Sequence, residues 1–208
     1  MHLALFGATG RVGGRLAEYA LDAGHTVRAL VRDPRKLRHR PVGLDVLTGD
    51  VLDLAAVTEV IRGADAVLSA LGGAGLADPG EAQSQGMRNI VAAMTALGVR
   101  RVIGVAGGGI LDAPGGGLRQ QQPGFPEIFR QVSDRHRQAW EALRASDLEW
   151  TLVCTGDIVP GERTGVYRLR DDLMPEGAGR ISVENVADFM LHELVERAHL
   201  RKRVGMGG

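Results

Sequence analysis

Three glycines recur three residues apart near the start of the chain, where the chemistry would be done by the backbone. Gly7, Gly10 and Gly13 follow an apolar run at 2–6 and border a helical pattern at 11–23. A strand that ends in a glycine turn and opens a helix places free N–H groups and the positive end of the helix dipole at one point, and that point binds phosphate. Because both the strand and the helix are present, the spacing predicts a dinucleotide-binding turn rather than an ordinary connection.

Basic residues cluster after the second apolar run, 26–31, where a nucleotide-binding α/β sheet meets the adenosine ribose. Arginine there suits the 2′-phosphate of NADP, whereas an acidic side chain suits the 2′-hydroxyl of NAD. Arg32 occupies this place, Arg35 and Lys36 follow within one turn, and Arg11 of the glycine loop is a fourth candidate cation. The alternative is a solvated, basic helix start with one acidic neighbour. The pattern favours NADP over NAD.

Strand-like and helical runs alternate along the chain. Parallel neighbours need crossover connections, so the alternation predicts an α/β fold: a Rossmann-type, doubly wound parallel sheet in a single domain, residues 1–208. The expected strands are 2–6, 26–31, 44–48, 65–70, 101–106 and 150–154. The expected helices are 11–23, 53–61, 81–97 and 127–145, with a shorter basic stretch at 34–40 and a final helix capped by Ser182.

Two long segments are rich in turn-forming residues. A loop as long as 107–126 in a compact domain is more often a functional cover than a connector, so we expect it to be a mobile loop over the active site. We expect 155–180 to form the opposite wall of the same site. Together they would make the substrate side of the domain.

The composition excludes several classes of partner. With 25 basic and 25 acidic residues the formal net charge is zero, so no overall field attracts nucleic acid or an anionic membrane. The single cysteine, Cys154, excludes an internal disulfide and a multi-cysteine metal site, and we expect no metal. No targeting pattern and no apolar run of membrane-spanning length is evident. We therefore expect a cytoplasmic, monomeric protein that acts on a small molecule.

Further stretches resemble the NAD(P)H-binding, NmrA-like group of atypical short-chain dehydrogenases, and within it the biliverdin reductase B/flavin reductase family. The matching stretches span nearly the whole chain: 6–13, 30–33, 49–52, 64–67, 86–94, 98–102 and 188–191. The resemblance implies a Rossmann fold, a nicotinamide cofactor and hydride transfer to a flavin or a linear tetrapyrrole.

The resemblance also implies particular cofactor contacts. Asp50 and Val51 would line the adenine, and Leu71 and Gly72 would pass the pyrophosphate and ribose. The alternative for Asp50 is that it only caps the next helix. The full set of expected cofactor contacts is Gly7, Thr9, Gly10, Arg11, Val12, Gly13, Arg32, Lys36, Asp50, Val51, Leu71, Gly72, Val105 and His136.

The catalytic signal is weaker than the cofactor signal. Neither Tyr19 nor Tyr167 has a lysine four residues later, so the Tyr-x-x-x-Lys pair of many short-chain dehydrogenases is absent, and no Gly-x-Ser-x-Gly elbow is present. The resemblance places a family serine at Gly107, so that hydroxyl is missing here. Hydride transfer to a conjugated acceptor needs mainly a close, aligned pocket, with protons drawn from solvent.

Two residues are candidate catalytic groups. His136 shares a helix face with Val132 and Trp140, so it points toward the sheet and the cleft, and the resemblance places a family histidine there beside the nicotinamide. Asp157 falls near a family histidine of the substrate pocket. The alternatives are a satisfied core histidine and an aspartate that makes a turn.

Three functions remain open on the sequence. The leading interpretation is an NADPH-dependent reductase of a flavin-like or other conjugated acceptor. The first alternative is a non-catalytic NADP(H)-binding redox sensor of NmrA-like type, which the glycine at position 107 favours. The second alternative, a nucleotide-sugar epimerase or dehydratase, is weakened by the absent Tyr-x-x-x-Lys pair.

Overall fold

Eight strands form the main sheet of the computed structural model, which describes residues 1–38, 40–73, 75–76 and 78–208. Their order across the sheet is β3, β2, β1, β4, β5, β6, β10, β8, and all pair in parallel except β8, which is antiparallel to β10. The bounds are β1 His2–Phe6, β2 Thr26–Val31, β3 Leu44–Thr48, β4 Ala66–Ser69, β5 Arg101–Gly107, β6 Glu149–Thr155, β8 Arg168–Asp171 and β10 Lys202–Gly207. A separate pair, β7 Asp157–Val159 and β9 Arg180–Ser182, lies beside it.

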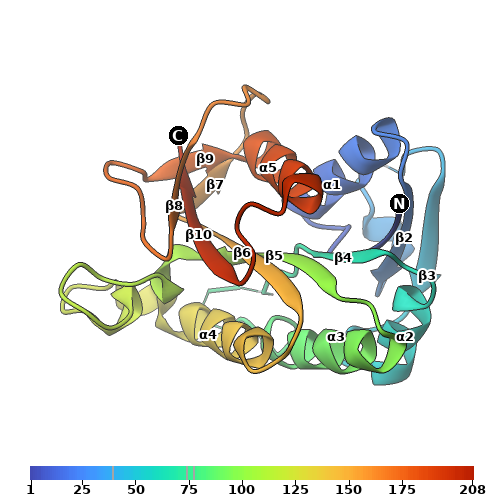
Figure 1. Ribbon diagram of the computed structural model, residues 1–208, viewed down its shortest axis with the longest axis horizontal. Helices are drawn as coiled ribbons and strands as arrows, with labels where there is room; N and C mark the ends of the chain where they lie inside the picture. The colour runs from blue at the N-terminus through green and yellow to red at the C-terminus, as the bar shows by residue number, and fades with distance from the viewer. Residues whose placement is uncertain (39, 74, 77) are drawn as a thin grey trace.

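Helices cover both faces of this sheet (Figure 1). On one face lie α1 Arg11–Asp22 and α5 Val183–Glu196, and on the other lie α2 Leu54–Ile61, α3 Ser84–Leu97 and α4 Arg130–Arg144. Short 3-10 turns are η1 Pro34–Lys36, η2 Gly108–Ile110, η3 Arg119–Gln121 and η4 Glu127–Phe129. The predicted Rossmann-type, doubly wound α/β fold is confirmed. No helix in the described part of the chain is long and apolar enough to cross a membrane.

The core consists of two apolar layers, one on each side of the sheet. Successive residues of β1 alternate between them: Leu3 and Leu5 pack under α1 and α5, whereas Ala4 and Phe6 pack over α2, α3 and α4. A strand covered on both faces has no solvent side, which explains why the central strands are continuous apolar runs.

Local signals set the helix boundaries. The Asp53 carboxylate accepts the Ala55 N–H at 2.9 Å and so starts α2, and Ser182 Oγ accepts the Asn185 N–H at 3.0 Å and so starts α5, as the sequence predicts. Gly98 ends α3 with a φ of +72°, a backbone conformation that favours glycine.

The structure corrects the sequence-based assignment in two places. The basic stretch expected at 34–40 is only the 3-10 turn Pro34–Lys36, because Leu37 already returns to extended backbone; residue 39 lies outside the described residues. Strands β7, β8, β9 and β10 were not predicted. Strands β7, β8 and β9 are short, and β8 is mostly exposed and charged, so neither length nor apolar alternation marks it. Strand β10 has six residues, but two are glycines and two are basic.

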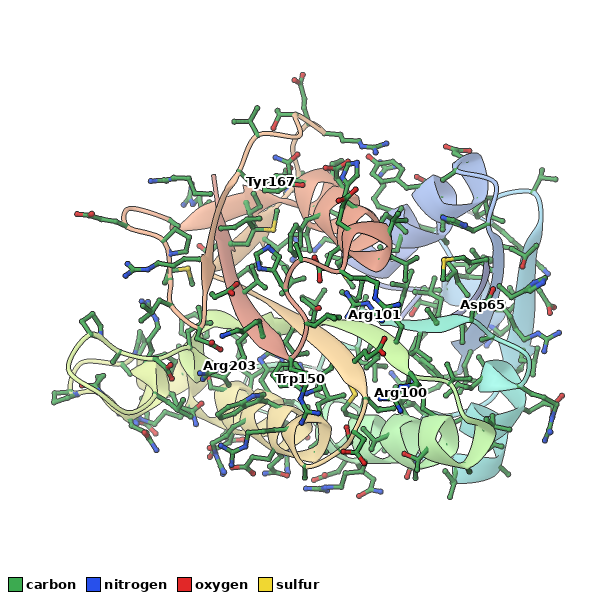
Figure 2. The ribbon with its side chains drawn as sticks, in the orientation of Figure 1. Asp65, Arg100, Arg101, Trp150, Tyr167 and Arg203 are labelled. Carbon is green, nitrogen blue, oxygen red and sulfur yellow. The ribbon has the colours of Figure 1, made fainter. Side chains whose placement is uncertain are left out.

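The segment 107–126 is also more ordered than expected. Asp112 N–H donates to the Asp172 carbonyl at 2.8 Å, and the Arg203 guanidinium donates to the Asp112 carboxylate at 2.8 Å. Arg203 comes from β10 and also donates to the Ile110 carbonyl (Figure 2). These bonds fix the first part of the segment to the far edge of the sheet, so it is not a structureless loop.

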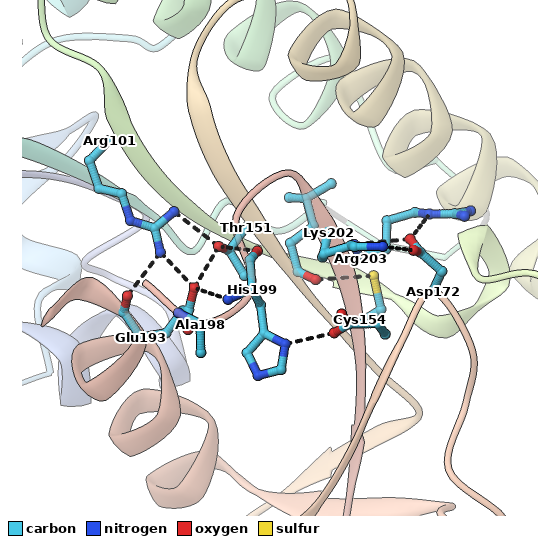
Figure 3. A network of polar contacts seen from close by, with 11 residues as sticks. Arg101, Thr151, Cys154, Asp172, Glu193, Ala198, His199, Lys202 and Arg203 are labelled. Carbon is cyan, nitrogen blue, oxygen red and sulfur yellow. Dashed lines mark hydrogen bonds and ion pairs between the residues drawn. The ribbon is translucent and has the colours of Figure 1, made fainter. Parts of the chain in front are cut away.

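A buried ion pair joins the amino ends of β5 and β6 to α5. Arg101 Nη2 lies 2.9 Å from Glu193 Oε1, and the two side chains are 5 % and 1 % exposed. Thr151 Oγ1 lies within hydrogen-bonding distance of both, and the Ala198 and His199 N–H groups donate to the same carboxylate (Figure 3). The carboxylate is therefore neutralised and hydrogen-bonded inside the protein.

Candidate functional site

A cleft of about 790 Å³ lies at the carboxyl ends of β1, β2, β4, β5 and β6. In an open α/β sheet this edge carries the ligand, because the loops after the strands diverge where the order of strands reverses. Here the reversal falls between β1 and β4, since β2 and β3 lie on one side of β1 and the later strands lie on the other. The cleft therefore has the place predicted for a nucleotide.

The glycine loop forms the floor of the cleft, and a different physical constraint favours glycine at each of its three positions. Gly7 turns the chain with a φ of +88°, and a Cβ there would lie 2.3 Å from the Ala70 carbonyl oxygen. A Cβ on Gly13 would lie 2.1 Å from the Gly7 carbonyl oxygen, so this residue permits α1 to pack against β1. Gly10 itself lines the cleft, where a bare backbone admits a phosphate.

The basic cluster is smaller than the sequence predicts. Arg32 is exposed and lines the cleft, and Lys36 is exposed beside it but does not line it. Arg35 is bound to Asp33 through two hydrogen bonds, at 2.9 and 3.1 Å. Arg11 donates to the Ile158 carbonyl at 2.9 Å. Arg11 therefore points toward β7, on the opposite side of β1 from β2.

Of the residues expected beside the adenine and ribose, some line the cleft and one does not. Val51, Leu71 and Gly72 line the cleft, as do Thr9, Val12 and Val105. Asp50 does not line the cleft: its carboxylate accepts the Leu52 N–H at 3.0 Å and forms a local turn. It does not cap α2 either, because Asp53 has that role. The contact of Asp50 with the adenine therefore stays a prediction.

The other end of the cleft is walled by α4 and by the chain after β6. Phe129, Val132 and His136 line one side, and residues 155–159 line the other, as expected for the start of 155–180. Of the fully described segment 107–126, only Gly107 lines the cleft. Asp112 of this segment is bonded to Asp172 and Arg203 at the far edge of the sheet, and the expectation that the segment covers the site stays a prediction.

His136 is fixed by two neighbours. Its Nδ1 accepts the Gly107 N–H at 2.8 Å, and its Nε2 lies 2.7 Å from the Gln83 side-chain amide. Burial lowers the pKa of His136 to about 4, so the imidazole is neutral at pH 7. A Cβ at Gly107 would lie 3.0 Å from His136 Nδ1, so a serine side chain there would require the imidazole to shift by a few tenths of an ångström.

Asp157 lines the cleft but is largely exposed. It belongs to β7, where its N–H donates to the Gly179 carbonyl, so it does not make the turn considered as the alternative. Its carboxylate lies 4.0 Å from Arg180 Nε across the β7–β9 pair. An exposed carboxylate at this edge can contact a ligand in the cleft.

Neither tyrosine reaches the cleft. Tyr167 donates its hydroxyl to the buried Asp188 of α5 at 3.1 Å, and burial together with this carboxylate raises the pKa of Tyr167 to about 12 (Figure 2). The Arg163 guanidinium lies over the Tyr19 ring, 4.5 Å from the ring centroid. Cys154 is buried in β6, and burial raises the pKa of its thiol. The described residues contain no group of three or more potential metal ligands.

Gln83 and Phe129 are two of the cleft residues that sequence reasoning missed. Gln83 precedes α3 in a polar stretch, and nothing in its type or spacing distinguishes it from a surface glutamine. Phe129 lies in a 3-10 turn before α4 rather than within the helix, so the helical period used for His136 does not place it. Only the tertiary fold brings both to the site.

Comparison with known proteins agrees with this geometry. A family model described as NAD(P)H-binding matches residues 7–197. The protein YwnB of Bacillus subtilis (strain 168) is 27% identical, over 98% of this chain and 96% of the relative.

Two solved structures extend the comparison. The "putative epimerase" of Bacteroides thetaiotaomicron is 31% identical with a TM-score of 0.85, covering 99% of this chain and 96% of that one. The "putative NADH-flavin reductase" of Streptococcus pneumoniae TIGR4 is 25% identical with a TM-score of 0.85, covering 100% and 99%. The glycine loop, the sheet order and the family model agree, and the chain belongs to the NAD(P)H-binding family.

Proposed function

We propose that this protein is an NADPH-dependent reductase that delivers hydride to a flavin-like or other conjugated acceptor. Bound NADPH would supply the hydride. The residues of the chain would bind the two planar reactants, align them and exclude water between them. The similarity to the "putative NADH-flavin reductase" of Streptococcus pneumoniae supports this class of acceptor.

The cofactor end of the cleft supports NADP over NAD. Arg32 follows β2 at the position that meets the adenosine ribose, it lines the cleft, and no described residue forms an ion pair with it. Lys36 adds a second exposed cation nearby. Gly10 and the amino end of α1 would receive the pyrophosphate.

The acceptor end carries the proposal. Its wall combines apolar groups, Leu76, Phe129 and Val132, with the neutral imidazole of His136. An apolar wall suits a flat conjugated ring, and a neutral imidazole whose Nδ1 is already occupied can position a ligand but does not supply a proton at pH 7. Acceptors that take their proton from solvent after hydride transfer fit this wall best.

A direct assay tests the proposal. NADPH oxidation is followed with FMN, with riboflavin and with a simple aliphatic ketone as a non-conjugated control. We expect turnover with the flavins and none with the ketone. NADPH binding without oxidation of NADPH by any conjugated acceptor would contradict the proposal.

That contrary result is what a non-catalytic NADP(H) sensor would give. The observation that favours a sensor is Gly107, which lacks the hydroxyl-bearing side chain of the family and lies directly against the His136 ring. An epimerase or dehydratase, suggested by the Bacteroides thetaiotaomicron relative, lacks support in the cleft because neither Tyr19 nor Tyr167 is among its described lining residues.

A further inference from the structure

Gln83 is a buried amide that the fold leaves half paired. It immediately precedes α3, is 5 % exposed, and lines the cleft, but its side chain does not cap the helix. As placed, Gln83 Nε2 lies 2.7 Å from His136 Nε2, and the buried Gln83 Oε1 has no hydrogen-bond partner in the described protein. Buried polar groups are nearly always paired, so an open end that borders a cleft marks a contact for a ligand.

The polarity of the open end follows from the imidazole. Because His136 Nδ1 accepts the Gly107 N–H, its lone pair is occupied and the proton of the neutral ring lies on Nε2. The Nε2–H group needs an acceptor, and the only acceptor of the Gln83 amide is its oxygen. In the placed orientation the Gln83 NH2 group and the His136 Nε2–H group would be two donors facing each other. The ends of an amide interchange by a half-turn, so we infer the turned orientation, with the oxygen facing His136 and the NH2 group as the open end.

A second buried amide on α3 provides a comparison. Asn89 is 8 % exposed; its Nδ2 donates to the Val51 carbonyl at 2.9 Å, and its Oδ1 accepts from Gln85 Nε2 at 3.0 Å. Both ends of Asn89 are therefore satisfied by the protein, which is the pattern of a structural residue. Gln83 departs from that pattern only on the side of the cleft.

We propose that Gln83 is a ligand-binding residue, oriented by His136, that donates an N–H hydrogen bond to a carbonyl oxygen of a planar ligand in the cleft. The proposal rests on the proposed reductase function for the identity of the ligands. The chain of donors runs from the Gly107 N–H to His136, from His136 to Gln83, and from Gln83 into the cleft. His136 is thus a positioning residue that selects which end of Gln83 meets the ligand.

Two ligands present such an oxygen: the carboxamide of the nicotinamide and a ring carbonyl of the acceptor. Both are planar carbonyl groups next to a conjugated ring, and both can be recognised by one amide donor. Binding measurements on each ligand separately distinguish them.

Two substitutions isolate the donor. Gln83→Met keeps the approximate length and removes both polar ends, whereas Gln83→Glu keeps an acceptor for His136 and removes the N–H donor. Gln85→Met is the matched control, because Gln85 lies on the same helix, bonds to Asn89 and does not line the cleft. Chemical denaturation verifies that each variant is folded.

Affinity for NADPH is measured by calorimetry, and affinity for FMN by fluorescence quenching with NADP⁺ present. We expect both Gln83 variants to weaken one of the two ligands about tenfold or more, and Gln85→Met to weaken neither. A loss confined to NADPH assigns the contact to the carboxamide, and a loss confined to FMN assigns it to the acceptor. If both Gln83 variants retain both affinities within about twofold of the native protein, the proposal is wrong.

A spectroscopic measurement tests the orientation independently. The ¹⁵N shifts of the His136 ring report which nitrogen carries the proton, and we expect Nε2–H in the native protein. An Nδ1–H ring would reverse the polarity of Gln83 and overturn the proposal. Neither this measurement nor the two titrations depends on turnover, so a protein that binds NADPH but reduces no acceptor would refute the reductase function without deciding the role of Gln83.

Discussion

At the amino ends of the strands, Arg101 and Glu193 meet in the interior and are surrounded by hydrogen-bond partners, whereas at the carboxyl ends Arg32 and Gln83 face a cleft with bonding capacity unused. The two regions belong to one sheet and differ in what supplies the hydrogen-bond and charge partners of their polar side chains. In the first, the protein supplies nearly every partner, and only Nε of Arg101 lacks one. In the second, a ligand must supply partners.

This difference distinguishes polar side chains that stabilise the fold from polar side chains that bind a ligand. A buried charge is tolerated when the fold supplies its counter-charge and its hydrogen bonds. Removal of one member of the pair leaves the other charge buried and uncompensated. A binding site keeps donors and cations aimed at a space. Substitutions at the amino end should therefore change folding alone, and substitutions in the cleft should change binding alone.

The largest effect is expected for Arg101→Leu. Removal of the guanidinium leaves the Glu193 carboxylate buried without its counter-charge, which should lower the free energy of unfolding by about 3–5 kcal/mol. The double variant Arg101→Leu/Glu193→Leu should recover much of the loss. Denaturant titration measures both, and NADPH affinity of the folded variant should be native. Weaker NADPH binding without loss of stability would contradict the claim that the Arg101–Glu193 pair acts on folding alone.

Acid should reveal the neutral state of His136. Its pKa is lowered to about 4 in the folded protein from 6.5, so the unfolded chain binds the proton first and the stability is present above pH 6.5 and lost as the pH falls toward 4. The loss should reach about 3 kcal/mol. The pH dependence of unfolding in the native protein and in His136→Gln gives this term as a difference. Parallel curves would show that the imidazole is not held neutral.

Gly10→Val should block the phosphate site without unfolding the protein. A Cβ at Gly10 meets only the Gly7 carbonyl oxygen, at 3.2 Å, and otherwise enters the cleft, so NADPH affinity should fall about a hundredfold while stability changes little. Gly13→Val is the contrasting variant, since its Cβ would overlap the backbone of Gly7 and should destabilise the fold as well. Calorimetry and denaturation together separate the two, and native affinity in Gly10→Val would refute the phosphate site.

Arg32→Ala should show the smallest of these effects and the most selective. A charge-assisted hydrogen bond contributes about 1.5–3 kcal/mol, so NADPH affinity should fall by about one to two decades while NADH affinity stays nearly constant. Arg35→Ala is the matched control, because Arg35 is bound to Asp33 and should contribute little. Equal losses of affinity for NADPH and NADH would contradict the preference for NADP.

The sequence was sufficient where local signals determine the outcome. The glycine spacing, the apolar strands and the Ser182 cap act through near neighbours, and the structure bears them out. The peripheral strands β7 to β10 escaped prediction because pairing with distant segments, not their own apolar pattern, makes them strands.

The candidate site divides in the same way. Thr9 and Arg32 could be placed because they follow predicted strands. Arg11 lines the cleft, as expected, but only the fold shows that its long side chain reaches the Ile158 carbonyl. Gln83 depends on a contact with His136, 53 residues away, and no pattern in the sequence records it.

Hydride transfer in the cleft is the central claim, and a single-turnover experiment tests it most directly. The native protein is mixed in a stopped-flow instrument with FMN and with NADPH, either unlabelled or deuterated at the transferred C4 position. We expect NADPH to be oxidised and the flavin to be reduced together, more slowly with deuterium, and neither event in Gly10→Val. Tight binding of NADPH with no flavin reduction in the native protein would contradict the account and favour the sensor.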